Sequence, residues 1–188
     1  MMALNFLPQL RSSVSTRRFA RVGHTHAGCI GIAFLLLWAA SGSPTRAEWI
    51  GSGESAYARQ DYVRSAAIFL RRAELGQAQA QTYLGYMYAN GRGVPQDYVA
   101  ASQWLRRAAE QGFPTAQFLL GLLYDKGHGV KQDFVEAEVW LNLASARAAA
   151  RQRDFWTRIR NAVAGKLTLA ELADAQQRAV QWAPIQGR

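Results

Sequence analysis

The sequence predicts an all-α fold, a right-handed α-α superhelix (solenoid) of about three helix-turn-helix repeats followed by a C-terminal region of capping helices. Three observations predict it. Residues 76–111 and 112–147 align without a gap and have identical residues at 16 of 36 positions. A period of 36 residues is typical of repeat architectures. Within each copy, apolar residues recur at helical spacing. Glycine and aspartate also recur where helices should end and begin.

The first helix of each unit has an apolar face and an internal glycine. Ala80, Leu84 and Tyr88 fall at i, i+4 and i+8, which places them on one face of a helix. Gly85 lies inside the same helix, where glycine costs about 1 kcal/mol relative to alanine. Because the second copy retains this glycine as Gly121, we expect a neighbouring helix to approach the backbone closely at this position.

A glycine-rich loop and an aspartate separate the two helices of each unit. The stretches "NGRGV" and "KGHGV" should end the first helix, since glycine adopts the left-handed conformation that a C-terminal cap needs. Asp97 and Asp133 then occupy the N-cap positions of the second helices. Glu136 follows Asp133 by three residues, which predicts a variant of the capping box.

The second helix of each unit carries an apolar stripe at i, i+3, i+4 and i+7. In the first copy this stripe is made of Ala101, Trp104, Leu105 and Ala108. The spacing makes core packing the expected role of Trp104 and its counterpart Trp140, rather than a stacking platform for bases or sugars. Gly76 and Gly112 should close the second helices.

Weaker patterns flank the two clear copies. Residues 56–76 align as a third copy that lacks a counterpart of residues 91–95, which predicts a tighter turn. Residues 151–167 predict one helix, and Thr168 with Glu171 predicts a capping box for another that stops before Pro184. We therefore expect repeats over residues 48–147 and capping helices over residues 148–188, which would seal the open end of the stack.

Residues 1–47 have the pattern of a targeting segment. They contain five arginines and no acidic residue, and an apolar run over residues 28–40 that is short for a membrane span. Small residues follow, with a possible cleavage site after Ala47. The segment predicts a signal peptide, and the alternative is an uncleaved N-terminal anchor. The expected location is exported, periplasmic or secreted from a bacterium, with anchoring to the inner membrane as the alternative.

Charge and cysteine usage exclude some classes of function and stabilisation. The net charge of +9 belongs largely to residues 1–47, since residues 48–188 carry 17 Lys+Arg against 13 Asp+Glu. The charge therefore gives no support for a nucleic-acid partner, and we expect none. The single cysteine, Cys29, lies within the targeting segment, so an exported chain would depend on packing for its stability.

The repeated units resemble a known family. "AQTYLGYMYANGRGVPQDYVAASQWLRRAAEQG" and "AQFLLGLLYDKGHGVKQDFVEAEVWLNLASA" are similar to Sel-1-like repeats, 36-residue relatives of the tetratricopeptide repeats. The resemblance covers about residues 54–147. It implies an α-solenoid that holds or senses other proteins, and it implies no catalytic chemistry. The cysteines that staple helix pairs in some secreted relatives do not occur in the repeats.

We expect no catalytic residue, no cofactor and no metal site, and therefore no enzyme. Outside residues 1–47 the single histidine is His128, which lies between two loop glycines without a partner suited to catalysis or metal binding. The glycine loops lack the Gly-Lys-Ser/Thr of a phosphate loop. Asp97 and Asp133 are accounted for by helix capping.

Two sets of residues are candidates for binding a partner. The first lies beside the repeated stripe of the first helices and would suit a peptide or helix in the concave face of the solenoid, unless it packs between helices. It comprises Gln79, Tyr83, Tyr86, Thr115, Leu119 and Leu122. The second is a basic patch for an acidic protein, a polyanionic polysaccharide or phospholipid headgroups, unless it is simply a solvated helix face. It comprises Arg147, Arg151, Arg153, Arg158 and Arg160.

These patterns predict a non-catalytic protein–protein interaction scaffold or regulator of the bacterial cell envelope. Two alternatives stay open: an envelope hydrolase or polysaccharide-binding accessory protein, and a membrane-tethered adaptor if the leader is not cleaved. The expected partners are other proteins, with contact to a membrane only through an uncleaved leader. Three repeats are close to the minimum for a stable stack, so a homodimer formed through one end is also expected.

Overall fold

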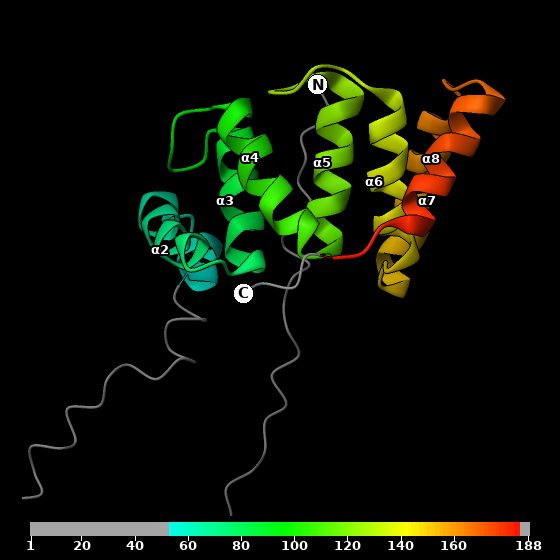
Figure 1. Cartoon of the computed structure of the whole chain (residues 1–188). Helices are drawn as coiled ribbons and strands as arrows, with labels where there is room; N and C mark the ends of the chain where they lie inside the picture. Colours follow the sequence, from blue (N-terminus) through cyan, green and yellow to red (C-terminus); the bar gives the residue numbers. More distant parts are fainter. Residues whose placement is uncertain (1–52, 185–188) are drawn as a thin grey trace, which may run out of the picture. The chain divides into compact units, whose positions relative to one another are not determined.

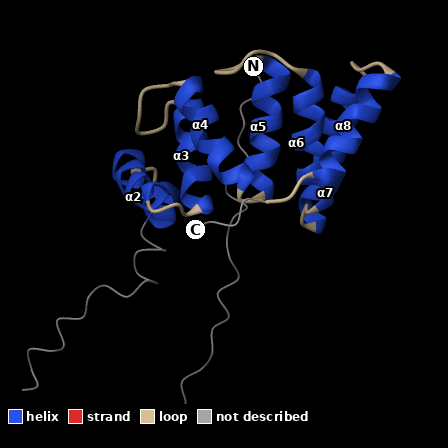
Figure 2. Cartoon of the chain, in the orientation of Figure 1, coloured by secondary structure: helices blue, strands red, loops and turns tan. Residues whose placement is uncertain are grey.

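The computed structural model describes residues 53–184. The predicted leader, residues 1–47, lies outside the described residues, and so do residues 185–188. Within the described range every regular element is a helix (Figure 2). The expectation of an all-α fold is therefore confirmed.

Seven labelled helices follow a helical segment at residues 53–58 (Figure 1). They are α2 (Tyr62–Glu74), α3 (Ala78–Asn90), α4 (Tyr98–Glu110), α5 (Pro114–Lys126), α6 (Phe134–Ala146), α7 (Ala150–Ala164) and α8 (Leu169–Gln181). Helices that follow one another in the chain pack side by side from α2 to α7, and α8 returns to α6. The chain thus stacks helical hairpins, as a solenoid does.

The predicted third copy forms the first hairpin of the stack. Residues 53–58 are helical, and a short turn leads into α2 at Tyr62. Gln60 takes a left-handed conformation (φ 65°) in this turn, and the Asp61 N–H donates to the Ala56 carbonyl at 2.9 Å. The glycine-rich loop of the later hairpins is absent here, so the tighter turn is confirmed.

The predicted caps of the central hairpins are present. The Asp97 carboxylate accepts hydrogen bonds from the backbone N–H groups of Val99 and Ala100 at 2.8 and 3.0 Å. Gly91 and Gly127 end α3 and α5 in the left-handed conformation. Because these caps satisfy backbone groups that a helix leaves unpaired, they fix where each helix starts and stops.

At Asp133 the capping box is incomplete. The Asp133 carboxylate accepts from the Glu136 N–H at 2.9 Å, as an N-cap should. However, the Asp133 N–H already donates to the Tyr124 carbonyl at 3.1 Å, and Glu136 forms an ion pair with Arg178 of α8. The expected reciprocal bond is therefore wrong here, whereas Thr168 and its partner on α8 form the full box.

The glycines inside the first helices allow each hairpin to close. A Cβ placed on Gly85 would lie 2.7 Å from Leu105 Cγ and 3.1 Å from the Ala101 carbonyl oxygen. At Gly121 the corresponding distance to Leu141 Cγ is 2.8 Å. These contacts are shorter than a side chain tolerates, so the predicted close approach of the second helix is confirmed.

The second glycine of each loop joins neighbouring hairpins. A Cβ on Gly93 would lie 2.2 Å from the Tyr62 carbonyl oxygen, and one on Gly129 would lie 1.9 Å from the Tyr98 carbonyl oxygen. Each loop therefore rests on the first turn of the second helix of the preceding hairpin. Sequence reasoning assigned these glycines to helix termination and missed this contact.

Repeated glutamines also link neighbouring hairpins. The Gln81 side-chain amide donates to the Ala73 carbonyl, and the Gln117 amide donates to the Ala109 carbonyl, both at 3.1 Å. Each bond adds a second donor to a carbonyl near the C-terminus of the preceding second helix, which also accepts from the backbone N–H of Gly76 or Gly112. The glutamine thus ties the first helix of one hairpin to the second helix of the hairpin before it. This explains why both copies keep the glutamine.

The last two helices pack on α6 rather than on each other. Trp156 and Val163 of α7 and Ala175 of α8 are buried. Lys166, between these helices, forms an ion pair with Asp125 of α5. The two expected helices are therefore present, while the exact domain boundaries at residues 48, 147 and 148 stay predictions.

Candidate functional site

The first candidate surface is largely inside the protein. The exposed fractions of Tyr83, Tyr86, Thr115 and Leu119 are 4, 1, 8 and 6%. Tyr83 stacks on Phe69 with ring centroids 4.5 Å apart, and burial raises the pKa of its phenol. The expectation that these four side chains form an exposed face is wrong, because they pack between helices.

Gln79 and Leu122, the other two residues of this set, are half-buried. The Gln79 amide donates to the Glu54 carboxylate at 3.2 Å. Gln79 and Leu122 are therefore the members of the set that a partner could reach directly. Their role in binding a partner stays a prediction.

The five arginines do not form one patch. On α7, Arg151 and Arg158 are exposed and lie two turns apart on one side. Arg153, which is also exposed, and the half-buried Arg160 lie two turns apart on the other side. Arg147 turns away toward the C-terminal end, with its guanidinium 5.4 Å from the Trp182 ring centroid. The five side chains therefore do not share one face of α7, because the helical period distributes them around the helix. Their role in binding an acidic partner stays a prediction.

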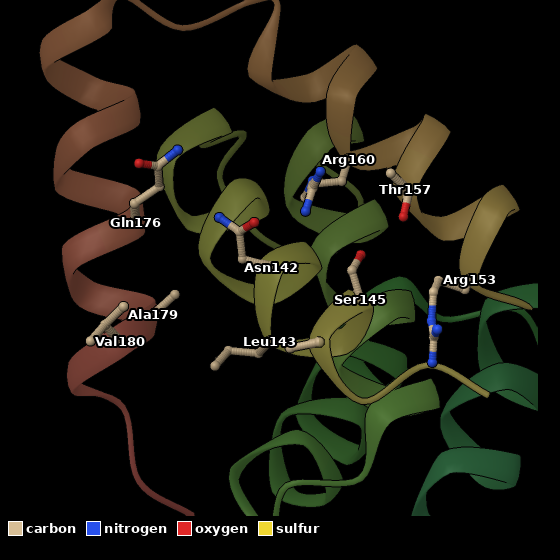
Figure 3. Close-up of a pocket in the computed structure, with 10 residues that line it drawn as sticks. Asn142, Leu143, Ser145, Arg153, Thr157, Arg160, Gln176, Ala179 and Val180 are labelled. Carbon is tan, nitrogen blue, oxygen red and sulfur yellow. The ribbon is translucent and has the colours of Figure 1, made fainter. Parts of the chain in front are cut away.

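Arg153 and Arg160 instead line a cavity of about 550 Å³ between α6, α7 and α8. Figure 3 shows α6 between the two last helices, with side chains from all three around the space. The lining residues are Asn142, Leu143, Ser145 and Ala146 of α6, Arg153, Thr157 and Arg160 of α7, and Gln176, Ala179 and Val180 of α8. The lining is rich in hydrogen-bond donors and contains no carboxylate.

Two polar groups in this lining lack hydrogen-bond partners within the described residues. They are Ser145 Oγ and Asn142 Nδ2, both buried. Ser145 as a whole is 8% exposed. Buried polar groups are nearly always paired, so two such groups without a hydrogen-bond partner beside a cavity are an unusual feature.

Glu138 lies one turn before Asn142 on α6 and is 2% exposed. Its Oε2 atom also has no hydrogen-bond partner within the described part of the chain. Burial raises the pKa of this carboxyl to about 7, and the charge of Arg160 and the amide of Asn142 offset only part of that effect. Glu138 is thus a buried acid that titrates near neutral pH.

Sequence reasoning missed Glu138, Asn142 and Ser145. The signal was a departure from the repeat: Ser145 stands where the earlier copies have Ala73 and Ala109. On the second helix of the last copy, the sequence patterns gave roles only to the cap and to the repeated apolar stripe, and these three residues belong to neither.

The residues that were considered for catalysis, metal binding or stacking can also be placed. Among residues 53–184, no group of three or more His, Cys, Asp or Glu side chains could hold a metal ion. His128 is exposed and stacks on Tyr98 with ring centroids 4.4 Å apart. Of the paired tryptophans, Trp140 is 6% exposed, whereas Trp104 is only half-buried beside Arg107.

None of the described helices has the length and apolar character needed to cross a membrane.

Comparison with known proteins identifies the repeats. The Sel1 repeat family model matches residues 78–113 and 114–148. The structure is similar to that of c5321, a protective antigen present in uropathogenic Escherichia coli strains displaying an SLR fold, with 32% identity and a TM-score of 0.66. That match covers 72% of this chain and 29% of the antigen, so this chain spans less than a third of its length.

A second solved structure is the Sel1 repeat protein from Oxalobacter formigenes. It is 34% identical, with a TM-score of 0.45, over 45% of this chain and 25% of that protein. The search of curated proteins found no match. Sel1 repeats generally mediate protein–protein interaction, and their fold is generally non-catalytic. The chain is a Sel1-like repeat protein, an α-solenoid with two matched Sel1 repeats.

Proposed function

We propose that this protein is a non-catalytic interaction scaffold or regulator in the bacterial cell envelope that binds another protein on its helical repeats. The observation that carries the proposal is the pair of Sel1 repeats, stacked by glycine and glutamine contacts whose role is to hold hairpins together. Such a stack offers shape and surface to a partner. The envelope location rests on the sequence of residues 1–47.

The partner is a peptide or helix that contacts the first helices where Gln79 and Leu122 are accessible. These residues occupy the side of α3 and α5 that the repeat leaves variable. Exchanging Tyr83 or Tyr86 for alanine would not test this contact, because both are core residues and the variant would lose stability. The two half-buried positions provide the cleaner test.

The test is crosslinking and pull-down of the tagged full chain from the native envelope. We expect a reproducible partner that the double variant Gln79→Ala/Leu122→Ala loses. Leu169→Ala is the matched control, since Leu169 is 87% exposed and lies on α8, away from α3 and α5. Recovery of no partner, or equal recovery by the double variant, would contradict the proposed contact.

Two further measurements separate the alternatives. N-terminal sequencing of the native protein should find a start near Glu48, whereas an intact leader in the inner membrane would support a tethered adaptor. The purified wild-type protein should not hydrolyse envelope polysaccharides. Turnover that follows the protein through purification would replace the scaffold with the hydrolase alternative.

A further inference from the structure

We propose that the cavity between α6, α7 and α8 binds a small organic carboxylate that carries a short apolar group. This ligand site lies at the C-terminal end of the described stack and does not depend on the partner contact at Gln79 and Leu122. Three features point to it: unused positive donors on one wall, unpaired polar groups on the floor, and apolar side chains next to them (Figure 3).

Arg153 and Arg160 supply the positive charge. Neither forms an ion pair within the described residues. The Arg153 guanidinium donates to the Ala148 carbonyl at 3.4 Å, and the Arg160 guanidinium donates to Asn161 Oδ1 at 2.8 and 3.2 Å. Since a guanidinium carries five N–H donors, both side chains retain donors for an anion.

The floor of the cavity supplies two more polar groups. Ser145 Oγ is buried and has no hydrogen-bond partner within the described residues, and leaving such a group unpaired is destabilising. Asn142 Nδ2 is buried and forms no direct hydrogen bond there either, although the Asn142 amide lies near enough to the Glu138 carboxyl to lower its pKa. At the Ser145 position the fold does not require a polar group, because the equivalent residues of the earlier copies are the buried alanines Ala73 and Ala109, 1% and 0% exposed. A ligand oxygen that accepts from both groups would satisfy them.

Apolar side chains select the rest of the ligand. Leu143 and Ala146 of α6 and Ala179 and Val180 of α8 also line the space. An inorganic anion would leave these side chains in water, whereas a ligand with a few apolar carbons would cover them. The volume of about 550 Å³ suits a molecule of that size.

Glu138 does not remove the positive character of the site. It is absent from the lining, and its buried carboxyl has a pKa raised to about 7. Near neutral pH it therefore neutralises the charge of Arg160 only in part. The second guanidinium, Arg153, forms no ion pair with a carboxylate within residues 53–184.

The experiment titrates the full chain with four probes and follows binding by calorimetry. N-acetyl-leucine and hexanoate carry the required carboxylate and apolar group. N-acetyl-leucinamide is the uncharged amide of N-acetyl-leucine, and inorganic phosphate is an anion without apolar carbons. We expect saturable binding of at least one carboxylate, and binding at least about tenfold weaker for the amide and for phosphate. Preference for N-acetyl-leucine would indicate the C-terminus of a polypeptide, and preference for hexanoate a free acid.

Three variants then locate the site. Arg160→Gln should weaken binding about tenfold, as expected for the loss of a charge-assisted hydrogen bond. Ser145→Ala should weaken binding without lowering the thermal midpoint, because the hydroxyl has no partner in the protein. Arg158→Gln is the matched control, since it removes the same charge from the exposed side of α7 and should bind like the wild type.

Several results would overturn the proposal. They are the absence of saturable carboxylate binding, equal affinity for the acid and its amide, tighter binding of phosphate, and equal weakening by Arg158→Gln and Arg160→Gln. Circular dichroism of each variant separates lost binding from lost folding. If Arg160→Gln or Ser145→Ala does not fold, the comparison of acid with amide on the wild-type chain decides.

Discussion

At Glu138, burial and charge oppose each other. The side chain is 2% exposed, and its Oε2 has no hydrogen-bond partner within the described residues. In the preceding repeat the same position is Ser102, whose hydroxyl bonds to the Val99 and Gly129 carbonyls at 2.8 and 3.3 Å. Gly129 belongs to the glycine-rich loop of the next hairpin, and no such loop follows the last repeat. Glu138 therefore lies against α7, and its charge bears the cost of desolvation.

The stability of the protein should therefore depend on the ionisation of Glu138. Its pKa is about 7 when folded and near its ordinary 4.5 when unfolded. Between these values the folded state holds more protons, so this residue makes stability fall as the pH rises from about 4.5 to about 7, with little change above. Glu138→Gln should gain several °C in thermal midpoint relative to wild type at pH 8, and much less at pH 5.

Thermal melts at pH 5 and pH 8 check this expectation. Glu74→Gln is the control, because Glu74 is exposed at the end of α2. If Glu138→Gln raises the thermal midpoint by the same amount at both pH values, the buried carboxyl does not titrate in this range.

Among the elements, the loops act as spacers between hairpins as well as caps. The loop after α3 rests on the start of α2, and the loop after α5 rests on the start of α4, through Gly93 and Gly129. Each contact joins hairpins across about one repeat of sequence. Inter-repeat contacts of this kind make the stability of a solenoid depend on its neighbouring units.

A pair of glycine variants isolates this contact. Gly76 and Gly129 both have positive φ, 80° and 69°, but a Cβ at Gly76 would meet nothing within 4 Å. Gly76→Ala should cost about 1–2 kcal/mol of unfolding free energy from backbone conformation alone. Gly129→Ala should cost about 1–3 kcal/mol more, since its Cβ would overlap the Tyr98 carbonyl.

Urea unfolding of both variants measures the difference. Equal costs would mean that the loop moves away from α4 freely and that the contact does not stabilise the stack.

At the scale of the described chain, the C-terminal end of the stack is covered by the last two helices and the segment after them. The last two helices, α7 and α8, both pack on α6, and Trp182 after α8 contacts Trp140 edge-on with ring centroids 6.2 Å apart. Trp104 holds the equivalent position one repeat earlier but is only half-buried. The segment after α8 therefore covers Trp140, which becomes a core residue, whereas its counterpart Trp104 stays partly exposed.

Exchanging each tryptophan for alanine should measure how much the burial of Trp140 contributes to stability. We expect Trp140→Ala to cost about 3–5 kcal/mol of unfolding free energy, as for a buried aromatic side chain. Trp104→Ala should cost clearly less, because Trp104 is only half-buried and its ring stacks on the exposed Arg107 guanidinium, 4.7 Å from the ring centroid. Chemical denaturation followed by far-ultraviolet circular dichroism checks both, and equal costs would contradict the covering role of α8.

The sequence could predict the features that recur in each repeat, namely the helices, their caps and the close approach of the paired helices. Shared glycines, aspartates and apolar positions defined the helices, the closure at Gly85 and the cap at Asp97, because these features depend on local backbone chemistry and on helical period. The spread of the arginines around α7 could have been predicted from the same period. The sequence also indicated Sel1-like repeats, which the comparison confirmed.

Burial and the cavity were decided by tertiary structure. Whether Tyr83 faces a partner or Phe69 depends on how the preceding hairpin packs, and sequence spacing places it on a face without saying what covers that face. Likewise, Ser145 becomes an unpaired group at a cavity only because α7 and α8 both pack on α6 and leave space between them. By itself, the sequence determined the repeating helical unit, since its periodic residues act through near neighbours. Tertiary structure decided which surfaces remain open, because that depends on contacts between residues far apart in the chain.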